Sequence, residues 1–359
     1  MKLANFSSID WPLMISVAVI IVFSLVSLFS IDASLFRSQF VFLIISLVAF
    51  LFFTQFNYSI LRYYWVPIYI ASLLILIAVL FLGIESRGSV RWFELFGIRL
   101  QFSEILKPFL ALSLAGYLTN LQSFSFRSFL VSLILLAPLV LLIFLQPDLG
   151  NALIYVFVVL SALLIYGFPL RWFLAGFVIW LMSLPFFWLI LHDYQKQRVL
   201  TFINPARDPL GTSYNAIQAV IAIGSGMFLG RGLGQGTQAG LRFLPERHTD
   251  FIFATISESL GFIGSAIVII AFAFLFYRLF NVIRNSEDDF SKNFSILAFL
   301  IIFVHFVINV GMNLGIVPIV GVTLPFVSYG GSSLLSNFIL LGLLFAVSRG
   351  KRREVLEIH

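Results

Sequence analysis

The sequence predicts an all-α polytopic membrane protein with about ten transmembrane helices and a long extracytoplasmic loop between the seventh and eighth. Hydrophobic residues make up 60% of the 359 residues and charged residues only 11%, whereas a soluble domain is about 25% charged. Phenylalanine alone contributes 43 residues, and its ring needs no hydrogen-bond partner in lipid. Lipid is therefore the expected solvent, and residues 1–359 are expected to form a single membrane domain.

Apolar stretches of about 20 residues, the length that crosses a bilayer, predict ten spans. They are Trp11–Ser30, Phe40–Phe56, Ile60–Gly83, Phe102–Leu118, Phe129–Leu145, Leu149–Tyr166, Leu170–Leu191, Phe251–Phe280, Phe294–Val317 and Pro325–Val347. The first is longer than the core of a usual signal peptide and further spans follow it, so it is expected to remain in the protein. An even number of spans puts both termini on one side.

Basic residues in short loops indicate which side is cytoplasmic. They gather on the side of the termini, most densely at Arg349–Arg353, so both termini are expected in the cytoplasm. The net charge of +6 fits this topology signal, and nucleic acid is not an expected partner. The loop 192–250 and a shorter segment, 84–101, then lie outside. The chain has no cysteine, which excludes disulfides and thiolate metal sites.

The long loop has internal structure of its own. Residues 219–229 are apolar but too few to span, so they predict a helix that lies in the interface or dips into the protein. The Gly230–Gly236 segment that follows has four glycines and predicts a flexible or tightly turned connection.

A group of ionisable residues opens the fourth span. Glu104 and Lys107 are three residues apart and share one helix face, and Asp148 joins the fifth and sixth spans on the same outer side. A Glu–Lys–Asp cluster there could serve the chemistry or lock the helices together as a structural ion-pair network. Asp148 also suits the N-cap of the sixth span.

Asp250 ends the long loop at the outer mouth of the eighth span. An acidic residue at a helix start is often only a cap. The functional interpretation is a general base at the boundary between water and lipid. Glu258 lies about two turns deeper and is either a buried hydrogen-bonded partner or a structural residue.

Arginines are frequent on the outer side, against the usual charge bias. Guanidinium groups bind pyrophosphate well, and the alternative for each is anchoring to lipid headgroups. The candidates for substrate binding are Lys107 and the arginines Arg91, Arg198, Arg207, Arg231 and Arg242. The four histidines lack metal-ligand spacing, and His305 is expected to be a hydrogen-bonded packing residue.

Pro325–Ser333 opens the last span with adjacent glycines and serines. Such residues allow helices to approach closely, so packing is the default interpretation and a re-entrant binding turn the alternative. Ser328 is included among the residues expected to support the site.

Several segments together resemble one family. They are Gln101–Lys107, Gln146–Gly150, Asp208–Gly211, Ile221–Gly226, Gly232–Gln238, Leu244–Phe253 and Val327–Ser332, with the pair Arg91 and Trp92. In this order they are similar to the shape, elongation, division and sporulation (SEDS) family over nearly the whole chain. The Pro245–Asp250 run and the short N-terminus resemble the elongation, or RodA, branch more than the division, or FtsW, branch.

The resemblance implies a peptidoglycan glycosyltransferase that polymerises lipid II outside the cytoplasmic membrane and works with a class B penicillin-binding protein. The family's essential aspartate falls on Asp250, its Glu and Lys near the fourth span on Glu104 and Lys107, and its loop aspartate on Asp148. Phe102 stands where many members carry proline, so the start of that span is expected to differ locally.

The expected chemistry combines these residues with an amphipathic substrate. The outer basic residues would hold the pyrophosphate, and Asp250 would take the proton of the attacking sugar hydroxyl. A divalent cation, Mg²⁺ or Mn²⁺, could assist the pyrophosphate, although the sequence shows no dedicated cage. Two alternatives remain open: a lipid II flippase, which shares the many-helix body, and a scaffold that only recruits the crosslinking enzyme.

Overall fold

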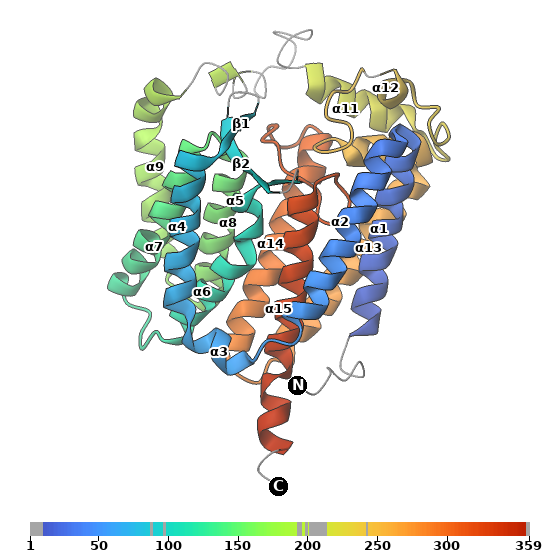
Figure 1. Cartoon of the computed structure of the whole chain (residues 1–359). Helices are drawn as coiled ribbons and strands as arrows, with labels where there is room; N and C mark the ends of the chain where they lie inside the picture. Colours follow the sequence, from blue (N-terminus) through green and yellow to red (C-terminus); the bar gives the residue numbers. More distant parts are fainter. Residues whose placement is uncertain are drawn as a thin grey trace.

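The computed structural model describes residues 10–86, 89–95, 98–191, 196–197, 200, 214–241 and 243–356. Helices in one bundle make up most of this part of the chain, and the strands lie at one end of it (Figure 1). In chain order the elements are α1 (Trp11–Ile31), α2 (Ala33–Phe53), α3 (Tyr58–Tyr63), α4 (Trp65–Leu82), β1 (Ile84–Ser86), β2 (Ser89–Leu95), β3 (Ile98–Leu100), α5 (Phe102–Ile105), α6 (Lys107–Thr119), α7 (Phe126–Leu145), α8 (Leu149–Tyr166), α9 (Leu170–Ile190), α11 (Tyr214–Ser225), α12 (Thr237–Gly240), α13 (Ile252–Arg284), α14 (Asp289–Asn313) and α15 (Gly331–Leu356).

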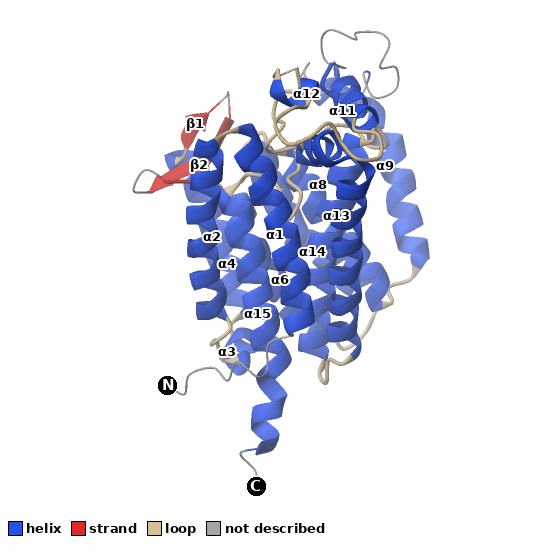
Figure 2. Ribbon diagram, turned by 90° about the vertical axis from the view of Figure 1, so that its right-hand side faces the viewer, coloured by secondary structure: helices blue, strands red, loops and turns tan. Residues whose placement is uncertain are grey.

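The predicted membrane architecture is confirmed. Eight helices of the described chain are long and apolar enough to cross a bilayer: α1, α2, α4, α7, α8, α13, α14 and the first part of α15. The shorter α6 and the peripheral α9 run beside them (Figure 1), so each predicted span overlaps a helix. The span Ile60–Gly83 is divided between α3 and α4, and Phe102–Leu118 between α5 and α6. The start of α1 and the end of α15 lie at one end of the bundle, and the strands with α11 and α12 lie at the other (Figure 2). We call the latter the loop end.

Local sequence explains where the spanning helices begin and end. The Asp10 carboxylate accepts a hydrogen bond from the Leu13 amide and so caps α1, satisfying one of the free amides of the first turn. α8 ends at Gly167, whose φ of +107° suits glycine and closes the helix in the left-handed conformation.

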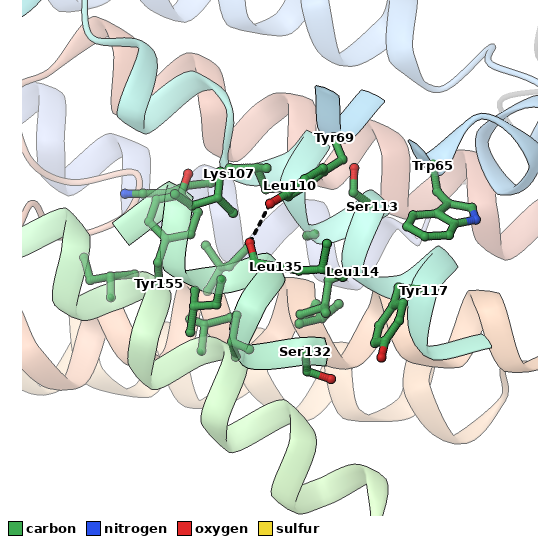
Figure 3. Close-up of a pocket in the computed structure, with 18 residues that line it drawn as sticks. Trp65, Tyr69, Lys107, Leu110, Ser113, Leu114, Tyr117, Ser132, Leu135 and Tyr155 are labelled. Atoms are coloured by element: carbon green, nitrogen blue, oxygen red, sulfur yellow. Dashed lines mark hydrogen bonds between the residues drawn. The ribbon is translucent and has the colours of Figure 1, made fainter. Parts of the chain in front are cut away.

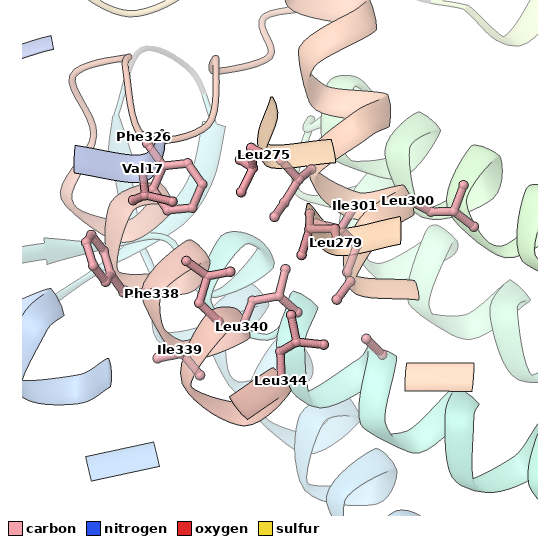
Figure 4. Packing of buried hydrophobic residues seen from close by; sticks show 14 of the residues in the cluster. Val17, Leu275, Leu279, Leu300, Ile301, Phe326, Phe338, Ile339, Leu340 and Leu344 are labelled. Carbon is pink, nitrogen blue, oxygen red and sulfur yellow. The ribbon is translucent and has the colours of Figure 1, made fainter. Parts of the chain in front are cut away.

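Two groups of helices share the bundle. α4, α6, α7 and α8 pack around one hydrophobic cluster, and α1, α2, α13, α14 and α15 pack around a larger one that also reaches α6 and α8. Figure 4 shows part of the larger cluster, in which Leu275 and Leu279 of α13 lie near Leu340 and Leu344 of α15. Lipid is as apolar as these side chains, so close packing and buried polar contacts hold the helices together.

The segment 84–101 contains a small sheet that the hydropathy analysis does not predict. β1 pairs with β2, and β2 with β3, all antiparallel. Val90, Trp92 and Phe93 give β2 the β-branched and aromatic side chains that favour strands. The strands are too short to show alternation clearly beside the long apolar spans.

The long helix α13 is broken at Gly261, whose φ is +66°. In a continuous helix the amides of Phe262 and Ile263 would bond to the carbonyls of Glu258 and Ser259. Here those amides donate to the carbonyls of Met227 and Phe228 instead. The carbonyls of Glu258 and Ser259 accept from the amides of Arg231 and Gly232. Four hydrogen bonds to the loop thus replace two helical ones, and residues 227–232 are joined to the middle of α13.

Gly261→Ala is expected to destabilise the protein by roughly 1–3 kcal/mol, because the break requires a positive φ that disfavours alanine. A Cβ there would also lie 2.3 Å from the amide nitrogen of Gly230. Thermal unfolding in detergent measures the effect. Gly176→Ala in α9 is the matched control, since a Cβ at Gly176 meets nothing within 4 Å, and equal melting temperatures for the two variants would contradict the prediction.

Candidate active site at the loop end of the bundle

Asp250 lies in the turn that precedes α13, at the loop end, and is half-buried. The N-cap of α13 is Phe251, which makes no side-chain cap, so Asp250 does not occupy the capping position. If a Cβ were built on Gly321, it would lie 3.5 Å from Oδ2 of Asp250. The carboxylate therefore lies against the segment that connects α14 to α15.

The main chain around Asp250 is held by buried side chains. Its carbonyl oxygen accepts hydrogen bonds from Nδ2 of Asn309 at 3.0 Å and Nδ2 of Asn313 at 2.9 Å. Ser328 Oγ donates to the carbonyl of the preceding residue, Thr249, at 2.6 Å, and the amide of Tyr329 donates to the carbonyl of His248 at 2.8 Å. Ser328, predicted as a supporting residue, is thus hydrogen-bonded to Thr249, the residue that precedes Asp250.

A second polar group surrounds Asp148 at the start of α8. Its Oδ2 accepts from Gln101 Nε2 at 2.6 Å, Ser103 Oγ at 3.1 Å and Asn151 Nδ2 at 2.8 Å, and its Oδ1 accepts from the Asn151 amide at 3.3 Å. The capping geometry predicted for Asp148 is therefore present, and its described hydrogen bonds go to Gln101, Ser103 and Asn151 and not to Glu104 or Lys107. The backbone amide of Gln101 donates to Ser332 Oγ at 2.9 Å. This hydrogen bond connects the polar group around Asp148 to α15.

Glu104 and Lys107 form a buried ion pair, with 2.8 Å between Lys107 Nζ and Glu104 Oε1. Lys107 Nζ also lies 2.7 Å from Nε2 of His305, and Nδ1 of His305 lies 2.7 Å from the carbonyl oxygen of Ile301. A carbonyl only accepts, so Nδ1 carries the proton and Nε2 accepts from the ammonium group. His305 is thus a partner of Lys107, beyond the packing role that the sequence predicts.

Glu258 is fully buried and bonded to the loop. Its Oε1 accepts from the amide of Gln238 at 2.8 Å, and a Cβ on Gly236 would lie 2.6 Å from its carboxylate. Glu258 lies eight residues after Asp250, and the helix from Ile252 to Glu258 alone rises about 9 Å. Of the two interpretations offered by the sequence, these contacts support the structural one, in which Glu258 fastens the start of α12.

The predicted phosphate-binding arginines fall in different parts of the chain. Arg91 lies on β2, partly exposed, and its Nε is buried without a hydrogen-bond partner among the described residues. Arg231 is exposed, and its Nε donates to the carbonyl of Ser225 at 3.1 Å. Arg198, Arg207 and Arg242 lie outside the described residues.

A cavity of about 50 Å³ lies within the bundle between α4, α6, α7, α8 and α14. Figure 3 shows Lys107 and Tyr155 at one end and Trp65 and Tyr117 at the other. Its other walls are largely leucine, isoleucine and valine, and the Tyr69 hydroxyl is taken up by the Leu135 carbonyl at 2.6 Å. Such walls suit a hydrocarbon chain and not a charged headgroup.

With this geometry established, similarity to known proteins identifies the family. A family model for FtsW, RodA and SpoVE, described as cell cycle protein, matches residues 6–353. This chain belongs to that family. The SEDS resemblance seen in the sequence motifs is therefore confirmed.

Individual relatives of this SEDS protein are similar over most of their length. The peptidoglycan glycosyltransferase MrdB of Escherichia coli K12 is 39% identical over 288 residues, covering 79% of this chain and 77% of that protein. The probable peptidoglycan glycosyltransferase FtsW of Trichlorobacter lovleyi is 35% identical over 324 residues, covering 88% and 83%.

Solved structures agree with this SEDS fold. A chain of a peptidoglycan synthase complex, described for the structural coordination of polymerization and crosslinking, has a TM-score of 0.83 at 32% identity and covers 95% of this chain and 97% of its own. The rod shape determining protein RodA of Thermus thermophilus has a TM-score of 0.73 at 29% identity and covers 96% and 98%.

The SEDS fold brings the two polar groups to opposite sides of one segment. A Cβ on Gly150, at the start of α8, would lie 2.5 Å from the carbonyl of Val320, so only glycine lets residues 320–322 lie this close to α8. The other side of the same segment faces the Asp250 carboxylate at Gly321. The Asp148 and Asp250 motifs, a hundred residues apart in the chain, therefore border a common site.

Proposed function

We propose that this chain is a peptidoglycan glycosyltransferase that polymerises lipid II into glycan strands, with Asp250 as the general base. The observation that carries the proposal is the position of Asp250: a partly buried acidic residue at the loop end of the bundle, on a main chain held by buried hydrogen bonds. The names of the relatives MrdB and FtsW support the reaction class.

In the proposed reaction Asp250 takes the proton from a sugar hydroxyl of the acceptor. The hydroxyl oxygen forms a bond to the anomeric carbon of the donor, and the bond from that carbon to the pyrophosphate oxygen breaks, with inversion at the carbon. Arg91 is the described arginine most suited to the leaving pyrophosphate, because its Nε has no hydrogen-bond partner among the described residues. Arg198, Arg207, Arg231 and Arg242 are proposed to share this role.

For Lys107 we propose a supporting role in place of direct contact with substrate. Only 2% of its surface is exposed, and its ammonium group is bonded to Glu104 and His305. We therefore assign it, with Glu104, Asp148, Glu258 and Ser328, to the network that shapes the site, and not to contact with pyrophosphate. A buried charge that is already paired gains little by changing partners.

The described residues do not fit a resident metal ion. They contain no group of three or more histidine, aspartate or glutamate side chains that could hold one. A divalent cation such as Mg²⁺ or Mn²⁺ would have to take most of its ligands from the pyrophosphate oxygens and water.

The setting of the reaction is also proposed. With both termini in the cytoplasm, as the basic residues indicate, the loop end faces outward and the site acts on the outer leaflet of the cytoplasmic membrane. A class B penicillin-binding protein is the proposed partner, supported by the similarity to a chain of a complex that couples polymerization to crosslinking. Similarity to MrdB and to RodA of Thermus thermophilus supports a role in cell elongation.

Purified protein given lipid II in detergent, together with the partner, is expected to form glycan strands that are seen as a ladder on a gel. A β-lactam blocks the partner's crosslinking activity in this assay. The flippase alternative makes a different prediction, namely movement of labelled lipid II between the leaflets of vesicles without new glycosidic bonds. Translocation without polymer, with the partner present, would overturn the proposal. A scaffold would give neither result.

A further inference from the structure

We propose that Asn309 and Asn313 of α14 are positioning residues that hold the general base in place. The inference rests on the proposed role of Asp250 and assigns the cause of its position. Neither asparagine touches the reacting atoms in this proposal. They act on the main chain of Asp250, whose carbonyl oxygen accepts from both side-chain amides.

Asn313 replaces a backbone hydrogen bond in the first turn of α13. In a regular helix the amide of Ala254 would bond to the carbonyl of Asp250, four residues earlier. Here that amide donates to Oδ1 of Asn313 at 3.1 Å, while Nδ2 of Asn313 donates to the Asp250 carbonyl at 2.9 Å. One side-chain amide is thus inserted between the two groups and holds Asp250 just outside the helix.

Asn309 ties the same carbonyl to the other wall of the site. Its Nδ2 donates to the carbonyl of Asp250 at 3.0 Å and to the carbonyl of Val322 at 2.6 Å. Residues 320–322 lie against the Asp250 carboxylate on one side and against Gly150 on the other. One amide therefore sets the spacing between the base and the segment that faces it.

Burying the side-chain amides of Asn309 and Asn313 is destabilising in itself, and packing alone does not explain why both are buried. They are four residues apart and share one face of α14, and both are completely buried in a largely apolar span. A buried amide is destabilising unless its hydrogen bonds are made. Here the bonds of both converge on Asp250, with both lone pairs of its carbonyl used.

Asn313→Leu is the variant that tests the inference, because leucine has a similar volume and no polar atoms. It frees the Ala254 amide to bond to the Asp250 carbonyl, which extends α13 and moves the carboxylate. We expect kcat for lipid II polymerisation to fall roughly 10–100-fold, since a displacement of about 1 Å at a reacting group has effects of this size, with KM unchanged within about two-fold.

The matched control is Asn293→Leu on the same helix. Asn293 is also buried and donates to Thr119 Oγ1 at 3.1 Å, but it lies five turns away, near the other end of α14. Its kcat and KM are expected to stay near those of the wild type. If Asn313→Leu does not fold, Asn309→Leu, which removes the donors to Asp250 and Val322, is expected to give the same loss of kcat at constant KM.

Asp250→Asn measured in parallel separates the general-base role of Asp250 from the positioning role of Asn309 and Asn313. An inactive Asp250→Asn with a folded Asn313→Leu or Asn309→Leu of full kcat overturns the positioning role and leaves the base in place. A fully active Asp250→Asn overturns the base and the positioning role together. A loss of kcat in Asn313→Leu matched by an equal loss in Asn293→Leu would also overturn the inference, since it would reflect weakened helix packing.

Discussion

Asp250→Asn is expected to lower the rate of glycan formation by roughly 10²–10⁴-fold, the usual contribution of a general base. Asparagine has nearly the same shape but cannot take up the proton of the acceptor hydroxyl. The hydrogen bonds from Asn309 and Asn313 reach the main-chain carbonyl and not the carboxylate, so the turn before α13 should be preserved. The initial rate of lipid II consumption by purified protein measures the effect, and KM should change little.

Asp32→Asn provides the control for this experiment. Asp32 also lies at the loop end, where its carboxylate accepts from the Ser34 amide at 2.7 Å and caps α2. Asparagine caps helices about as well as aspartate, so this variant should polymerise lipid II at the wild-type rate. A folded Asp250→Asn protein with the same rate as Asp32→Asn would remove Asp250 from the reaction.

Lys107→Met is expected to destabilise the protein by roughly 3–5 kcal/mol, because it leaves the Glu104 carboxylate buried without its counter-charge. Both side chains are at most 10% exposed, and the ion pair is 2.8 Å long. The double variant Glu104→Gln with Lys107→Met removes both charges and should lose much less than the sum of the single changes. Thermal unfolding in detergent, analysed as a double-mutant cycle, measures the coupling.

Exchanging the charges of Glu104 and Lys107 is a further test of the ion pair. Glu104→Lys with Lys107→Glu restores an ion pair but places a carboxylate against Nε2 of His305, which accepts a hydrogen bond in the native protein. The exchange is therefore expected to recover stability only in part. Glu94→Gln, at the exposed pair with Arg99, should cost at most about 1 kcal/mol, and a loss as small as this for Lys107→Met would contradict the buried role.

Hydropathy was enough to predict the bundle, because the length and continuity of apolar stretches decide which segments cross lipid. The span Leu149–Tyr166 coincides with α8 residue for residue. The break in α13 could not be predicted in this way. Gly261 lies inside a predicted span, and its conformation depends on hydrogen bonds to residues 227–232, which no local pattern reveals.

The candidate site was predicted in part. The motifs located Asp250, Asp148 and the buried pair, since charged groups near lipid need a reason. The same reasoning could have marked Asn309, Asn313 and His305, which are polar residues in an apolar span. Their partners, however, are main-chain carbonyls and a lysine far away in the sequence, and only the packing of α14 against α6 and the start of α13 shows them.

The break at Gly261 has a consequence for the insertion of the protein into the membrane. While α13 is being inserted, the carbonyls of Glu258 and Ser259 and the amides of Phe262 and Ile263 can satisfy one another only in an unbroken helix, since lipid offers no partners. Residues 227–232 precede α13 in the chain, so the bonds to them can form as soon as the two segments meet. We expect α13 to be inserted as a regular helix and to break at Gly261 only when it packs against residues 227–232.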